Sequence, residues 1–294
     1  MGYRPRVGEG SAANADHAGG SALPPDREEA GAGRLIDSHA HLLHLKAPLN
    51  PEIALEEARA AGVEAVVNIG NDPGDNQAGI DLTERIAGLR TTVGWHPHVA
   101  SEPMTAEQRR ELRRQVAHAN VVAVGEIGLD YHFTDYHRVP AKEQARAFRD
   151  MLALSQEVGK PVVLHTREAF ADLLAILDEF PGTSGVFHCF SGNAAIATEA
   201  LARGFLISFA ATVTYPNSHQ VVGAAGTVPL DRMLVETDSP FLPPQSRRGK
   251  PNAPAFLPET VAFIAGLQGT SPEAVAQATA ANAVQLFHLQ ADRE

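Results

Sequence analysis

The sequence predicts an α/β fold, namely a (β/α)8 TIM barrel with a metal site at the C-terminal mouth of its strands. Eight short apolar runs alternate with amphipathic stretches over about 255 residues, which is the period and size of such a barrel. Six side chains that can bind metals follow these runs: His39, His41, Glu126, His165, His188 and Asp238. Because all strands of the barrel end at one mouth, we expect these six side chains to converge.

The apolar runs predict eight strands, near residues 34–38, 63–69, 91–95, 121–126, 161–165, 185–190, 205–209 and 233–237. Runs such as 121–124 are apolar almost without interruption, as is typical of strands buried on both faces. Amphipathic stretches predict helices, for example over residues 52–61, 106–119, 142–158, 169–180, 194–203, 256–267 and 272–289. A doubly wound open sheet is the alternative. It is disfavoured because its ligands would gather at one switch point, whereas the first and last strands both contribute here.

Composition divides the chain into two parts. Residues 1–33 are rich in Gly, Ala and Pro without apolar periodicity, and we expect a disordered tail. Residues 34–294 form the barrel domain, and the overall hydrophobic content of 44% is sufficient for a full core. The tail lacks the apolar centre of a signal peptide and no stretch reaches the length of a membrane span, so we expect a cytoplasmic protein without a membrane partner. The sequence leaves the oligomeric state open.

The first strand and the fourth strand carry three of the six candidate ligands. His39 and His41 are two residues apart, so an extended backbone directs both imidazoles to the same face. Glu126 follows the flexible Gly125, and its two oxygens can bind one cation each. Each signal is weak by itself, because histidines on a polar strand face and solvated glutamates are common.

The later strands repeat the pattern. His165 and His188 each follow an apolar run, and the alternative for each is a hydrogen-bonded core histidine. Asp238 follows the last run, with Glu236 on the same face by alternation and Thr237 on the opposite face. Recurrence at five strand ends predicts one shared metal site. The single cysteine, Cys189, excludes an intramolecular disulfide, and alternation predicts that it points away from the site as a small buried hydrophobe.

The ligand types predict the chemistry. Imidazole and carboxylate ligands suit Zn²⁺, Mn²⁺, Ni²⁺ or Mg²⁺; four histidines favour Zn²⁺, whereas two carboxylates also permit Mg²⁺ or Mn²⁺, so we expect divalent metal ions of undetermined identity. A pair of such ions activates a water molecule for hydrolysis. Asp238 is the predicted general base, with the alternative of a purely structural ligand, and Glu126 is the second predicted catalytic carboxylate, which can bridge two cations.

Four further polar residues near strand ends are candidate substrate contacts: His96, Tyr131, His132 and Arg167. His96 lies in a tight turn after the third strand, where it can donate a hydrogen bond to a phosphate. The alternative for His96 is a polar contact that fixes the end of the strand, and the alternative for the other three is an ordinary loop residue or a supporting role around the metal ligands.

The chain resembles the TatD family of metal-dependent hydrolases, a branch of the amidohydrolase superfamily. The matching segments are DSHAH at 37–41, GWHP at 94–97, GEIGLDYH at 125–132, LHTRE at 164–168, HCFSG at 188–192 and ETDSPFL at 236–242. They extend from the first strand to the last, and a glutamate without a nearby lysine at the fourth strand favours this branch.

The resemblance implies a barrel with a two-metal site and deoxyribonuclease activity at DNA ends; some relatives are described as acting on aminoacyl-tRNA. By the same resemblance, His39, His41 and Asp238 would hold one metal, His165 and His188 the other, and Glu126 would bridge them. The loop 251–254 departs from the family. It reads Pro-Asn-Ala-Pro where relatives commonly carry Arg-Asn-Glu-Pro, which leaves substrate choice open.

Three functional hypotheses follow. The first is a two-metal phosphodiesterase or exodeoxyribonuclease that acts on DNA ends, the second a two-metal ester or amide hydrolase such as an aminoacyl-tRNA deacylase, and the third a non-catalytic metal-binding protein. The formal net charge of −11 is opposite to that of proteins that bind long duplexes. Single-stranded DNA ends or small phosphoesters are therefore the favoured substrates, with Arg247, Arg248 and Lys250 as further candidate phosphate contacts.

Overall fold

Eight parallel strands form one sheet whose order follows the chain, from β1 to β8. The computed structural model describes residues 34–133 and 138–289, so the predicted tail lies outside the described residues. The strands are β1 (Leu35–Ala40), β2 (Val63–Asn68), β3 (Arg90–Val93), β4 (Val121–Asp130), β5 (Val162–Arg167), β6 (Gly185–Phe187), β7 (Leu206–Phe209) and β8 (Met233–Val235). All eight predicted strands are present.

The sheet closes on itself beyond the end of β8. Ala40 and Ser239 form a parallel bridge, and the amide N–H of His41 donates a hydrogen bond of 2.7 Å to the carbonyl oxygen of Ser239. The amide of Asp238 in turn donates to the carbonyl of His39 at 2.9 Å. The fold is therefore a barrel, and the open-sheet alternative is wrong because the first and last strands meet.

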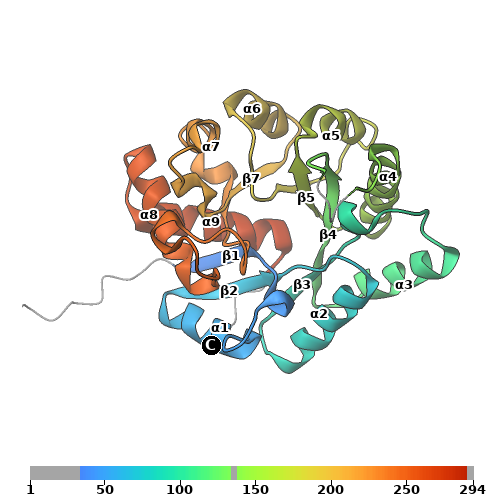
Figure 1. Cartoon of the computed structure of the whole chain (residues 1–294), viewed down its shortest axis with the longest axis horizontal. Coiled ribbons are helices and arrows are strands. Elements are labelled where there is room, and N and C mark those ends of the chain that lie inside the picture. The colour runs from blue at the N-terminus through green and yellow to red at the C-terminus, as the bar shows by residue number, and fades with distance from the viewer. Residues whose placement is uncertain (1–33, 134–137, 290–294) are drawn as a thin grey trace, which may run out of the picture. The chain divides into compact units, whose positions relative to one another are not determined.

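Helices surround the strands (Figure 1). They are α1 (Pro51–Ala60), α2 (Pro73–Arg85), α3 (Ala106–Val116), α4 (Ala141–Val158), α5 (Phe170–Leu177), α6 (Ala194–Ala202), α7 (His219–Ala225), α8 (Leu257–Gln268) and α9 (Pro272–Phe287). Several begin with a polar cap followed by proline: Asn50 accepts the N–H of Ile53 at the start of α1, and Asp72 caps α2. No helix among residues 34–133 and 138–289 is long and apolar enough to cross a membrane.

Alternating strand residues build two packed layers. One set faces the surrounding helices, as Val66 and Val162 do, and the other faces the barrel interior, as Val67 and Val163 do. The interior set packs against one face of α9 through Ala280, Ala283 and Phe287. Because most of these strand residues lie near the N-terminal ends of their strands, α9 closes that end of the barrel. Buried polar side chains lie at the opposite mouth, at the C-terminal ends of the strands.

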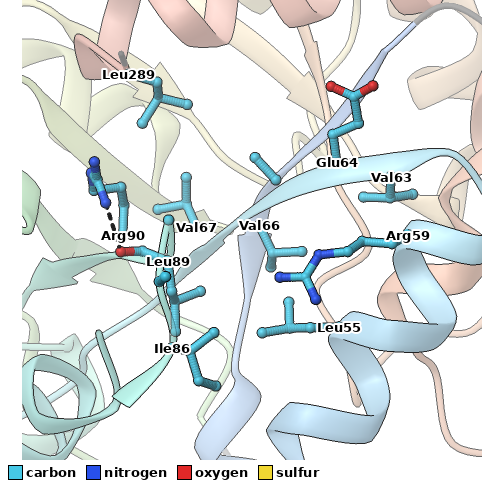
Figure 2. Close-up of a pocket in the computed structure, with 13 residues that line it drawn as sticks. Leu55, Arg59, Val63, Glu64, Val66, Val67, Ile86, Leu89, Arg90 and Leu289 are labelled. Atoms are coloured by element: carbon cyan, nitrogen blue, oxygen red, sulfur yellow. Dashed lines mark hydrogen bonds between the residues drawn. The ribbon is translucent and has the colours of Figure 1, made fainter. Parts of the chain in front are cut away.

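A cavity of about 140 Å³ lies where β2 and β3 begin (Figure 2). Its walls combine aliphatic side chains such as Leu55 and Val66 with the charged residues Arg59, Glu64 and Arg90, and no histidine or cysteine lines it among the described residues. The one carboxylate in the lining, Glu64, is paired with Arg34 at 3.1 Å. Polar residues at the N-terminal end of such a barrel serve stability rather than catalysis, so the candidate chemistry lies at the other end.

Candidate metal centre

The end of β1 brings two imidazoles together. The Nε2 atoms of His39 and His41 are 3.2 Å apart, and both side chains are buried. A shift in the β1–β2 register between Asp37 and Ala40 accompanies this arrangement, which simple alternation along the strand does not describe. Irregularities of this kind commonly redirect side chains beside functional sites.

Two carboxylates complete this first group of donors. Oε2 of Glu126 lies 3.5 Å from both His39 Nε2 and His41 Nε2, and Oδ1 of Asp238 lies 3.6 and 3.4 Å from the same two atoms. The ligand atoms of a tetrahedral Zn²⁺ ion, each about 2.1 Å from the metal, are about 3.4 Å apart. The donor set therefore fits one divalent cation.

A second group of donors faces the other oxygen of Glu126. Oε1 lies 2.7 Å from His165 Nδ1 and 2.8 Å from His188 Nε2, and these two nitrogens are 3.3 Å apart. His96 approaches the same oxygen, with Nε2 at 3.4 Å. Glu126 thus presents one oxygen to each group of histidines, as a carboxylate that bridges two cations must.

Glycine makes room for the backbone of Glu126. The amide of Glu126 donates a hydrogen bond of 2.9 Å to the carbonyl of Gly70, and the neighbouring Gly94 lies so close that a Cβ there would be 2.3 Å from that amide nitrogen. A side chain at position 94 would push β4 away from β3. The Gly of the GWHP segment is therefore required by the backbone approach that positions the bridging carboxylate.

Both carboxylates of the centre are ionised at neutral pH. Burial alone would raise the pKa of Glu126, but the imidazoles of His188 and His96 outweigh it and hold this pKa well below its usual range. Burial is likewise outweighed at Asp238, where a hydrogen bond from His41 and the charge of His39 lower the pKa. Ionised carboxylates are the form that binds cations.

Burial disfavours the charged form of every histidine in the centre, but nearby carboxylates outweigh it at His165 and His188 and raise the pKa of both. Burial lowers the pKa of His39, and it lowers the pKa of His96 to about 4, so that these two imidazoles are neutral near pH 7. Neutral imidazole is the ligand form of histidine.

The prediction that Cys189 points away from the site is wrong. Cys189 has a φ of 39°, which interrupts the alternation that was to point its side chain away from the site. The residue is half-buried. Its pKa is raised well above the usual range, first by burial and then by the nearby carboxylates of Asp238 and Glu236, so the thiol is protonated and lies beside the centre.

The predicted substrate contacts lie in different surroundings. His96 faces the centre, as described above. The hydroxyl of Tyr131 donates to Asp172 at 2.8 Å, and Nδ1 of His132 lies 2.8 Å from Glu168 Oε1. Arg167 ends β5 and is exposed, and its guanidinium forms no ion pair in the part of the chain that the structure describes. Their roles in substrate binding stay predictions.

The basic run after β8 is partly committed to contacts within the protein. Nε of Arg247 lies 2.5 Å from Glu259, and its guanidinium lies 3.9 Å from the centre of the Phe256 ring. Arg248 lies over the ring of Tyr215 at 4.6 Å. The loop that departs from the family pattern keeps a structural role through Asn252, whose side chain donates to the carbonyl of Thr237 at 2.7 Å.

Sequence reasoning missed two supporting residues of the centre. Asp130 lies in the GEIGLDYH segment, yet nothing in the segment alone shows which side chains it meets; in the structure it is buried and accepts hydrogen bonds from two imidazoles. Glu236 was assigned only a face of its strand. In the structure it contacts His188 and the backbone of Cys189.

Comparison with known proteins places the chain in a family. Residues 36–288 match the model of the TatD-related DNases. The chain is 39% identical over 264 residues to the uncharacterised metal-dependent hydrolase YcfH of Escherichia coli K12, a match that covers 88% of this chain and 97% of that protein. It is 36% identical over 242 residues to the 3′-5′ ssDNA/RNA exonuclease TatD of Cronobacter sakazakii, with 79% and 90% covered.

A solved structure agrees with these matches. The TatD homologue YJJV of E. coli K12 superimposes with a TM-score of 0.80 at 28% identity, and the match covers 87% of this chain and 99% of that one. The family model extends from the first strand to the last helix, and the relative and the solved structure each cover nearly nine tenths of the chain. The chain therefore belongs to the TatD-related DNase family and is a metal-dependent hydrolase.

Proposed function

We propose that the protein is a two-cation phosphodiesterase that removes nucleotides from the ends of single-stranded DNA. The observation that supports it most directly is the position of Glu126, whose oxygens face two separate groups of histidines. His39, His41 and Asp238 would hold one cation, and His165 and His188 the other, with Glu126 shared. The exonuclease name of the Cronobacter relative supports the choice of substrate.

In this proposal each side chain has a separate role in catalysis or substrate binding. When bound, the two cations would supply an activated water molecule and would neutralise charge on the phosphoryl group. Asp238 is ionised at the edge of the centre and accepts the proton of the attacking water. His96 donates a hydrogen bond to a phosphate oxygen, and the exposed Arg167 binds the next phosphate along the strand. The mixed imidazole and carboxylate ligands suit Zn²⁺, Mg²⁺, Mn²⁺ or Ni²⁺, and the four imidazoles favour Zn²⁺.

One assay separates the proposed function from the alternative of an aminoacyl-tRNA deacylase. Protein loaded with each cation in turn is incubated with labelled single-stranded DNA, blunt duplex DNA and charged tRNA, beside the Glu126→Gln variant as a control for contaminating nucleases. We expect stepwise shortening of the single strand and no activity in the variant, because an amide nitrogen cannot replace the second carboxylate oxygen at a cation. Intact DNA together with loss of the aminoacyl group would transfer the proposal to the deacylase.

A further inference from the structure

Two buried carboxylates lie behind the second group of histidines. Given the two-cation function proposed above, on which this inference rests, we propose that Asp130 and Glu236 are positioning residues that hold His165 and His188 in the tautomer and orientation that the second cation requires. Each imidazole turns one nitrogen toward Glu126 and the other toward one of these carboxylates.

Asp130 supports His165 from the end of β4. Nε2 of His165 lies 3.0 Å from Asp130 Oδ2, whereas Nδ1 lies 2.7 Å from Glu126 Oε1. When a cation is bound by Nδ1 and Glu126, Asp130 remains the acceptor for the imidazole N–H, because an ionised carboxylate only accepts hydrogen bonds, and it would hold the proton on Nε2. The lone pair of Nδ1 is then available to a cation.

The backbone around Asp130 is held by several contacts. Oε1 of the buried Gln144 accepts the N–H of Asp130 at 2.7 Å, and Nε2 of Gln144 donates to the carbonyl of Asp130 at 2.8 Å. The close approach of β4 to β5 depends on Gly128, where a Cβ would lie 2.0 Å from the carbonyl oxygen of His165. The carboxylate therefore meets His165 in a fixed geometry. His98 donates to the same oxygen, Oδ2, at 2.9 Å.

Glu236 supports His188 in the corresponding way. Its Oε1 accepts the N–H of Cys189 at 2.7 Å and lies 3.3 Å from His188 Nδ1, whereas His188 Nε2 faces Glu126 at 2.8 Å. Glu236 is fully buried, and its other oxygen has no hydrogen-bond partner within residues 34–133 and 138–289. A buried carboxylate with one unpaired oxygen costs stability, so its presence calls for a function.

The first group of histidines has no such support. Nδ1 of His39 is buried without a hydrogen-bond partner among the residues described, and Nδ1 of His41 lies 3.3 Å from the side-chain amide of Asn71. Carboxylate support is thus confined to one of the two groups. Removal of Asp130 or Glu236 should therefore weaken the binding of one cation and leave the binding of the other unchanged. A general loss of stability would weaken the binding of both.

The experiment is a titration of the cation-free, full-length protein with Zn²⁺, followed by calorimetry and elemental analysis. The variants are Asp130→Ala and Glu236→Ala, with Asp130→Asn and Glu236→Gln as conservative replacements that keep an accepting oxygen. His165→Ala marks the loss of the second cation. Glu157→Gln, in an exposed pair with Arg113, controls for the removal of one negative charge. The melting temperature of each cation-free variant is measured alongside.

We expect the first cation to bind as in the wild type and the second to bind about 10- to 100-fold more weakly in the alanine variants. The asparagine and glutamine variants should recover part of that loss. Weaker binding of both cations together with a lower melting temperature of the cation-free protein would overturn the inference. Cation affinities of the alanine variants equal to those of Glu157→Gln would also overturn it. If the wild type binds one cation, the two-cation function fails and the inference with it; two tight cations in every variant would refute the inference alone.

Discussion

Asp238 is the residue that we propose as the general base. It lies 3.4 Å from His41 Nε2 and 3.6 Å from His39 Nε2, and its pKa is held below the usual range although it is buried. We expect Asp238→Asn to lower kcat by about 10²- to 10⁴-fold with little change in KM, because an amide still coordinates weakly but accepts no proton. Single-turnover kinetics with the cation content measured in the same sample test this.

Cys189→Ala is the matched control for that variant. Cys189 borders the same centre, yet its thiol stays protonated, so we expect normal turnover. Near-normal turnover of Asp238→Asn with both cations bound would remove Asp238 as the base.

Asp37 should give the protein a pH-dependent stability. Burial raises its pKa from 3.8 to about 7, against hydrogen bonds from Thr237 and His39. A raised pKa means that the folded state binds the proton more tightly. The stability that Asp37 contributes is therefore fully present below pH 3.8 and is lost as the pH rises through about 7.

We expect the neutral variant Asp37→Asn to lack this loss of stability. Urea unfolding of the cation-free wild type and variant from pH 4 to pH 8 measures it, and the difference between the two proteins should shift in favour of the variant as the pH rises. A difference that stays constant over the range would show that Asp37 is ionised in the folded protein throughout.

The helix α9 is the element that closes the barrel at the end opposite the metal centre. Phe287 is 1% exposed and packs with the inward-facing strand residues. We expect Phe287→Ala to lower the free energy of unfolding by about 3–5 kcal/mol, because the truncated ring leaves a cavity. The exposed Val284 on the same helix is the control, and Val284→Ala should change it by less than about 0.5 kcal/mol. Denaturant unfolding measures both, and kcat should stay unchanged in both.

The strands show which parts of the fold local sequence can predict. Apolar runs predicted all eight strands because strands buried on both faces need continuous hydrophobicity. The run at 121–126 belongs to a strand that continues to Asp130, since Gly125 and Glu126 do not end it. Register shifts in β1 and between Val124 and Ile127 in β4 could not be predicted, because they depend on pairing with neighbouring strands.

In the metal centre, too, some features could be predicted from local sequence and others depend on strand pairing. Residue types and strand ends were sufficient to predict that six ligand-type side chains would converge. Which nitrogen of His165 faces Glu126, and that the carboxylate of Asp130 lies behind it, depends on the β4–β5 register that pairs Gly128 with His165. The orientation of Cys189 was predicted wrongly because alternation assumes an extended backbone, and its φ of 39° departs from one.

Charge over the whole molecule limits how nucleic acid binds. The net charge of −11 repels a polyanion, and Arg247 is already paired with Glu259. Arg167 ends β5 two residues after His165, is exposed and forms no ion pair among the described residues, so we propose it as the phosphate contact outside the centre. Binding should therefore depend on the centre and on very few further contacts.

Few phosphate contacts predict a shallow dependence on salt and a preference for single-stranded ends. Each phosphate neutralised on a single strand contributes about 0.7 to the slope of log affinity against log salt concentration. We expect the slope for a labelled single strand, measured from kcat/KM over a series of salt concentrations, to fall by about that amount in Arg167→Ala and to stay unchanged in Arg247→Ala. Blunt duplex should be cut more slowly throughout. An unchanged slope in Arg167→Ala would exclude a phosphate contact there, and equal cleavage of duplex would show that the acidic surface does not govern substrate choice.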